Sequence, residues 1–153
     1  MEIATHLKNS HLLQGLDDED LAIAEEHMYE TCLEPGEALF NDGDDGGYMC
    51  FVVSGSLEAL KKNSAGEEVR LTLLGSGDSI GEMAVIDGEV RSATVRSVDE
   101  AKLLVLTRKG FGLLLEQHPR IGAAVLMRIA RFLSKRVRES SNVLVEALQP
   151  AGR

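Results

Sequence analysis

Short apolar runs separated by turn residues fill the centre of this chain and limit its fold more than any other feature. Between Met28 and Thr107, runs rich in β-branched, apolar and aromatic residues are interrupted by Gly, Asp and Asn. This spacing is typical of an antiparallel barrel or jelly roll made of short strands. The predicted strands are residues 29–33, 38–40, 49–53, 57–61, 69–74, 92–98 and 102–107.

Turn-forming residues lie between these strands. Pro35-Gly36 and Asn41-Asp42-Gly43 favour tight turns, and Ser54-Gly55-Ser56 separates two predicted strands. Asn63-Ser64-Ala65-Gly66 is predicted at an exposed hairpin tip. The turns therefore support a β-rich fold over residues 28–107.

Residues 1–27 have a helical pattern. A first apolar segment contains Ile3, Leu7, Leu12, Leu13 and Leu16. The acidic run Asp17-Asp18-Glu19-Asp20 precedes a second apolar segment, and acidic residues are favourable in the first turn of a helix. We therefore interpret the run as a helix start rather than a metal site.

Two further helices are predicted in residues 108–149. A short helix spans residues 108–116, and His118-Pro119 separates it from a long helix over about 120–148. The long helix has one apolar stripe, interrupted by a serine: Leu126, Ile129, Leu133, Val137, Ser140, Leu144 and Leu148. Basic residues fall on its opposite face, which we expect to be solvated: Arg128, Arg131, Lys135 and Arg138. The stripe can cover the barrel, pair with a second copy, or do both.

Size and charge restrict the class of protein. A length of 153 residues suits one domain, predicted over residues 1–149 with a tail at 150–153. The net charge of −9 argues against direct nucleic-acid binding, which depends on basic surfaces. No apolar run approaches the roughly 18 residues of a membrane span. The start of the chain also lacks a signal-peptide pattern, so a cytoplasmic protein is expected.

The chain offers little catalytic chemistry. Its two cysteines, Cys32 and Cys50, lie in strand-like runs and are interpreted as reduced core residues. The four histidines lie outside the predicted strands: His6, His11, His27 and His118. A metal-bearing jelly-roll enzyme would need ligands on its strands, and no nucleophile is paired with a base. Neither an enzyme nor a metal site is therefore predicted.

One segment, residues 81–96, has the chemistry of a ligand site. Gly81 precedes a short helical stretch whose first N–H groups can bind an anion. Arg91 follows after a short loop and opens a strand-like run, so the chain can bring its guanidinium back to the helix start. Arginine binds phosphate through paired hydrogen bonds. Glu82 would repel a phosphate unless it accepts from a hydroxyl on the same ligand, so the segment predicts a ribose phosphate.

These residues resemble the phosphate-binding segment of cyclic-nucleotide-binding domains, as found in the bacterial catabolite activator family and in regulatory subunits of cyclic-AMP-dependent protein kinase. The matching motifs are Gly81-Glu82-Met83-Ala84 and Arg91-Ser92-Ala93-Thr94-Val95, at the family's separation. Val90 departs from the pattern, because many members have proline there. The resemblance covers roughly residues 34–138 and implies an eight-stranded antiparallel jelly roll with N-terminal helices and a long C-terminal helix. The alternative is an Arg–Glu pair that fixes a surface turn.

The resemblance also implies base and dimer contacts. Leu71 and Thr72 fall on the strand that lines the base, and Ser92 is the residue found in cyclic-AMP-selective members. Ser140 and Ser141 fall where hydroxyl residues of the facing subunit reach the adenine. From the residues alone, both serine hydroxyls can equally form hydrogen bonds to the backbone of their own helix. The resemblance therefore implies a homodimer formed through the C-terminal helix.

The resulting hypothesis is a cytoplasmic, non-enzymatic sensor of a cyclic purine nucleotide. Cyclic AMP is the favoured ligand, with cyclic GMP as second candidate, and no cofactor is expected. Family members that regulate transcription have a helix-turn-helix after the long helix, and none is recognised here. We therefore expect the signal to pass to an unknown protein partner through movement of the C-terminal helix. One alternative is a scaffold or interaction module that kept the fold but no longer binds nucleotide. Another is a fragment or stand-alone partner of a larger regulator, which would still bind the nucleotide.

Overall fold

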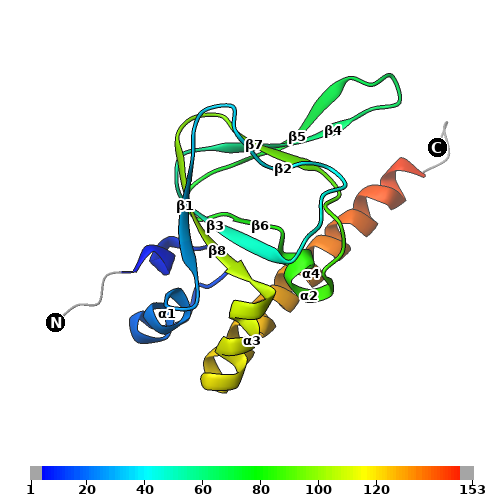
Figure 1. The fold of residues 1–153 in the computed structure, drawn as a ribbon. Helices are drawn as coiled ribbons and strands as arrows, with labels where there is room; N and C mark the ends of the chain where they lie inside the picture. The colour runs from blue at the N-terminus through cyan, green and yellow to red at the C-terminus, as the bar shows by residue number, and fades with distance from the viewer. Residues whose placement is uncertain (1–4, 149–153) are drawn as a thin grey trace.

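The computed structural model describes residues 5–148 and contains two four-stranded antiparallel sheets flanked by helices (Figure 1). One sheet has the order β1 (Tyr29–Leu33), β8 (Ala101–Thr107), β3 (Tyr48–Ser54), β6 (Ser79–Ile80). The other has the order β2 (Ala38–Phe40), β7 (Thr94–Ser97), β4 (Leu57–Lys62), β5 (Glu68–Leu74). The predicted eight-stranded jelly roll with flanking helices is confirmed. The predicted residue Ile3 and the tail at 150–153 lie outside the described residues.

Most predicted strands agree with the structure within one residue at each end, with two exceptions. Strand β6 was not predicted, because two residues are too few for a periodic pattern. The run predicted over 92–98 forms a strand only at Thr94–Ser97. Residues 91–93 therefore remain outside the sheet, next to the loop that follows the short helix α2 (Glu82–Asp87).

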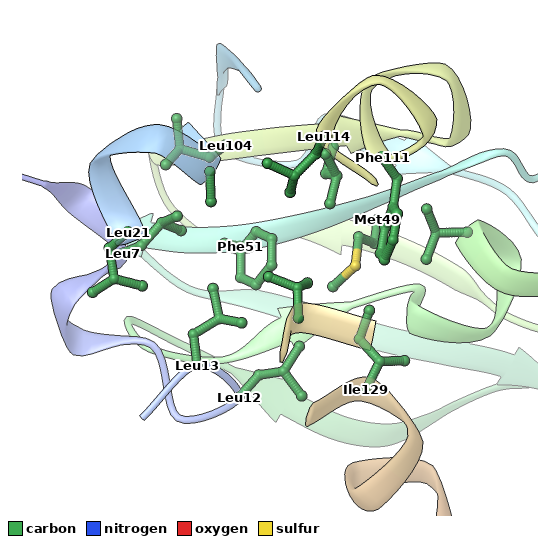
Figure 2. Close-up of a cluster of buried hydrophobic side chains, with 14 of the residues drawn as sticks. Leu7, Leu12, Leu13, Leu21, Met49, Phe51, Leu104, Phe111, Leu114 and Ile129 are labelled. Carbon is green, nitrogen blue, oxygen red and sulfur yellow. The ribbon is translucent and has the colours of Figure 1, made fainter. Parts of the chain in front are cut away.

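The central strands of the first sheet are buried on both faces. Cys50 and Val52 of β3 pack between the sheets, with Leu57 and Val95 from the other sheet. The alternate residues of β3 face the helices. Figure 2 shows one of them, Phe51, among leucines of the N-terminal segment, of β8 and of a helix that follows the barrel. This sheet therefore separates two cores and fixes the helices against the barrel.

The N-terminal segment is less helical than predicted. It begins with a 3-10 helix, η1 (His6–Asn9), followed by a turn, and only α1 (Asp18–Glu25) is α-helical. Leu7, Leu12 and Leu13 are nevertheless buried in the core. Asp17 caps α1 by accepting a 2.8 Å hydrogen bond from the Asp20 backbone N–H, which agrees with the interpretation of the acidic run as a helix start.

The two C-terminal helices are α3 (Arg108–Gln117) and α4 (Pro119–Ala147). The face of α4 that packs on the core contains Ile121, Val125 and Ile129, all buried. Leu126, predicted in the apolar stripe, is instead 39% exposed. Beyond Leu133 the stripe leaves the barrel, and its apolar residues are exposed: Val137, Leu144 and Leu148. The stripe therefore divides into a part that covers the core and a part that is exposed among the residues described.

The interpretation of Cys32 as a core residue was wrong. Cys50 is buried, whereas Cys32 is exposed on β1. This strand lies at the sheet edge and only its last residue, Leu33, is buried, so its outer positions face solvent. Within residues 5–148 no group of three or more His, Cys, Asp or Glu side chains could hold a metal ion. None of the helices described is long and apolar enough to cross a membrane.

Candidate functional site

The turn between β6 and α2 depends on Gly81. Its φ of +78° is a left-handed conformation that favours glycine. A Cβ atom at this position would lie 2.3 Å from Nη1 of Arg91. Glycine is therefore favoured here for two reasons. It permits the turn, and it lets the Arg91 guanidinium approach the start of α2.

Arg91 is buried beside a backbone carbonyl and two aromatic rings. It is 4% exposed, and its Nη2 donates a 2.6 Å hydrogen bond to the backbone carbonyl of Tyr48. The guanidinium carbon lies 4.1 Å from the centroid of the Phe40 ring and 4.4 Å from that of Tyr48. Its Nε is buried and has no hydrogen-bond partner. No carboxylate among residues 5–148 forms an ion pair with Arg91, so the alternative of an Arg–Glu surface pair is wrong.

Neighbouring loops fix the backbone on either side of this arginine. The Arg91 N–H donates to the Asp44 carbonyl and its carbonyl accepts from the Gly43 N–H, both at 2.8 Å. Nζ of Lys61 donates a 2.7 Å hydrogen bond to the Ser92 carbonyl. The segment that leads into β7 is therefore held in place although it is not part of the sheet.

Glu82 begins α2 and is 4% exposed. Its Oε1 accepts a 2.5 Å hydrogen bond from the Ser79 hydroxyl. A buried carboxylate requires hydrogen-bond donors or cations. Among the described residues, Ser79 is the side chain that donates to Glu82.

Glu82 and Arg91 line one cavity of about 380 Å³, which is within the range of small-molecule sites. Of the residues predicted to contact a ligand, the structure brings these to the cavity: Gly81, Glu82, Met83, Ala84, Arg91, Ser92, Ala93, Leu71 and Thr72. Ser140 and Ser141 do not line it and lie exposed on α4. Their predicted role requires a second subunit, which the structure does not contain.

Several other residues that line the cavity were not predicted, and three of them bear directly on the site. Phe40 stacks on Arg91, Ser79 donates to Glu82, and Arg136 reaches the cavity from α4. Ser79 could have been found from its position just before Gly81-Glu82. No local signal identifies the other two, because Phe40 and Arg136 come from elements distant in sequence.

Leu71 and Thr72 lie on β5, the edge strand of the second sheet. Thr72 is opposite Ala59 of β4, and the register then shifts before Leu60 pairs with Arg70. Leu71 falls at this irregularity and is 57% exposed although it lines the cavity. One wall of the cavity is therefore apolar and open to solvent.

Two ionisable neighbours of Arg91, Cys50 and Tyr48, do not neutralise its charge. Burial raises the pKa of the Cys50 thiol to about 12, although the nearby Arg91 charge opposes this shift. Burial also raises the pKa of Tyr48 above its ordinary value. Because thiol and phenol both remain protonated at neutral pH, neither supplies a negative charge for Arg91. The cavity therefore offers a buried cation to an anionic ligand.

Comparison with known proteins identifies the family. The profile of the family described as "Cyclic nucleotide-binding domain" matches residues 30–118. The cyclic AMP receptor protein of Thermus thermophilus is 31% identical over 134 residues, which are 88% of this chain and 60% of that protein. A cAMP-dependent protein kinase regulatory subunit from Blastocladiella emersonii is 28% identical over 116 residues, 76% of this chain and 29% of the relative.

A solved structure supports the same assignment. The crystal structure of Thermus thermophilus catabolite activator protein gives a TM-score of 0.81 at 30% identity, covering 89% of this chain and 62% of the other. The chain spans less than two thirds of the length of these relatives. The matched region includes nearly all strands and the whole of α2 with its following loop. The chain therefore belongs to the cyclic nucleotide-binding domain family.

Proposed function

We propose that this protein is a non-catalytic sensor of a cyclic purine nucleotide, with cyclic AMP as the preferred ligand. The observation that supports this most strongly is Arg91, a buried cation whose Nε has no hydrogen-bond partner and which forms no ion pair with a carboxylate of residues 5–148. Leaving a buried charge unpaired costs several kcal/mol. A phosphate bound at the start of α2 would supply the missing counter-charge and accept hydrogen bonds from the guanidinium.

Glu82 supports a second feature of the proposed ligand, a ribose hydroxyl. A carboxylate that shares a cavity with a phosphate is tolerated when it accepts a hydrogen bond from a neutral donor on the ligand. The 2′-hydroxyl of a ribose is such a donor. Met83, Ala84 and Ala93 add small or apolar contacts near the same turn.

The base is proposed to lie against the wall formed by Leu71 and Thr72. Ser92 is exposed next to Arg91, and serine at this position favours adenine over guanine by the family resemblance. The exposed apolar residues at the far end of α4 support a homodimer in which Ser140 or Ser141 of the second subunit closes over the base. The relatives named for cyclic AMP are consistent with this ligand.

The output is proposed to pass through α4 to a protein partner. Arg136 of α4 lines the cavity, so a ligand there contacts the helix whose far end is exposed. Binding would shift an existing equilibrium between positions of α4. The proposal makes the protein a cytoplasmic regulatory module without nucleic-acid or membrane binding of its own.

Calorimetric titration with cyclic AMP, cyclic GMP and ATP tests the proposal. We expect cyclic AMP to bind most tightly, cyclic GMP more weakly, and ATP not measurably. Circular dichroism of the same sample establishes that the chain is folded. A folded chain that binds none of the three nucleotides would overturn the proposal and favour the alternative of a scaffold module.

A further inference from the structure

The carboxylate of Glu82 is held by a residue on the other side of the Gly81 turn. Ser79 lies on β6, where its backbone is opposite Phe51 of β3. The left-handed Gly81 then turns the chain so that Ser79 and Glu82 line the same cavity. The distance of 2.5 Å from the Ser79 hydroxyl to Oε1 is typical of a hydrogen bond to an ionised carboxylate.

This hydrogen bond restricts the terminal side-chain torsion of Glu82. The terminal torsion of a glutamate is broad, so a carboxylate without a partner can rotate. Glu82 is 4% exposed, which leaves few water molecules to orient it. With Oε1 occupied by Ser79, the other oxygen of the carboxylate remains available to a ligand in the cavity.

We propose that Ser79 is a positioning residue that directs the free Glu82 oxygen at the ribose 2′-hydroxyl and so sets the preference for ribose over deoxyribose. This inference rests on the proposed function, because it requires a cyclic nucleotide in the cavity. Ser79 acts through Glu82. The Ser79 hydroxyl donates its single O–H hydrogen bond to Oε1 of Glu82. The other carboxylate oxygen then accepts a hydrogen bond from the ligand.

The experiment compares cyclic AMP with 2′-deoxy cyclic AMP. Ser79→Ala should weaken cyclic AMP binding about three- to ten-fold, a part of the value of a hydrogen bond to a charged group. The affinity for the 2′-deoxy nucleotide should stay within about two-fold, because the hydroxyl that Glu82 reads is already absent. Ser79→Thr keeps a hydroxyl and should restore the discrimination. Ser76→Ala is the matched control, since the Ser76 hydroxyl donates to the Val53 carbonyl instead.

The Ser79→Ala substitution made in a Glu82→Ala variant distinguishes a positioning role of Ser79 from direct contact with the nucleotide. In Glu82→Ala, adding Ser79→Ala should not weaken cyclic AMP binding further, because the two residues act as one unit. An undiminished effect of Ser79→Ala in that background would mean that the hydroxyl contacts the nucleotide itself, which overturns the inference. Equal weakening of both nucleotides by Ser79→Ala would overturn it as well and leave the proposed function standing. A wild-type chain that binds neither nucleotide would overturn both.

Discussion

Nη2 of Arg91 donates a 2.6 Å hydrogen bond to the Tyr48 carbonyl, and the guanidinium carbon lies 4.4 Å from the centroid of the Tyr48 ring. Tyr48 therefore holds the arginine both through its backbone and through its aromatic ring. The Phe40 ring, 4.1 Å away, restricts the guanidinium further. A cation fixed in this way loses little side-chain entropy when an anion binds.

The first prediction concerns this arginine. Arg91→Ala should weaken cyclic-nucleotide binding about thirty-fold or more, because truncating one partner of a buried charge pair costs roughly 2–5 kcal/mol. Arg91→Lys should recover little, since lysine lacks the planar fork. Calorimetry measures both. Arg96→Ala is the control, because Arg96 pairs with Glu58 and Glu68 and does not line the cavity. An Arg91→Ala variant within three-fold of wild type would refute the assignment.

The predictability of the site depends on distance along the chain. Gly81, Glu82 and Arg91 could be predicted because one turn, one short helix and one loop place them together. Phe40 and Arg136 could not, because β2 and α4 are brought to the cavity only by packing of the sheets and helices. The roles of Ser140 and Ser141 stay predictions, because they depend on a second chain.

The same distinction applies to the fold. Strands β3 and β8 were predictable because both of their faces are buried, which produces continuous apolar runs. The exposure of Cys32 was not, because a single sequence does not reveal which strand forms a sheet edge. The pattern of N-terminal leucines predicted their burial correctly but predicted the wrong backbone conformation. A 3-10 helix followed by a turn buries Leu7 and Leu13 just as an α-helix would.

The second prediction uses two glycines of α3. A Cβ at Gly112 would meet no atom within 4 Å, and this residue lines an apolar cavity of about 270 Å³. Gly112→Ala should therefore raise the free energy of unfolding by about 0.5–1 kcal/mol through helix propensity. Gly110→Ala is the matched variant and should destabilise, because its Cβ would lie 2.7 Å from the His27 carbonyl oxygen. Urea unfolding measures both. Equal effects of the two substitutions would contradict the packing described.

The third prediction is a pH dependence from Cys50. Its pKa is raised by burial from the ordinary 9.0 to about 12, so the native state keeps a proton that the unfolded state loses. The contribution to stability is fully present below pH 9.0 and is lost as the pH rises toward about 12. Within that window Cys50 lowers the free energy of unfolding by at most about 1.4 kcal/mol for each pH unit. Urea unfolding at several alkaline pH values should show a shallower loss for Cys50→Ala than for wild type. Parallel curves would contradict the assignment.

The last prediction depends on the exposed end of α4. Val137, Leu144 and Leu148 are 65%, 57% and 71% exposed in the single chain. Since these side chains follow one face of the helix, pairing with a second copy would bury them together with Ser140. A charge placed within such a face would be desolvated in the dimer but remain in water in the monomer. Substitution there should therefore separate dimerisation from folding.

Leu144→Glu should accordingly give a folded monomer, which light scattering detects. The monomer should still bind cyclic AMP, because Glu82 and Arg91 belong to one chain, but more weakly and with less discrimination against cyclic GMP. The reason is that the base would remain open to water on the side where Ser140 or Ser141 of the second subunit is proposed to close. Lys135→Glu puts the same side chain on the opposite face of α4 and should leave the dimer and the base preference unchanged. If a proven Leu144→Glu monomer kept the full preference for cyclic AMP, the base would be selected within one chain, by Ser92 and the wall of Leu71 and Thr72.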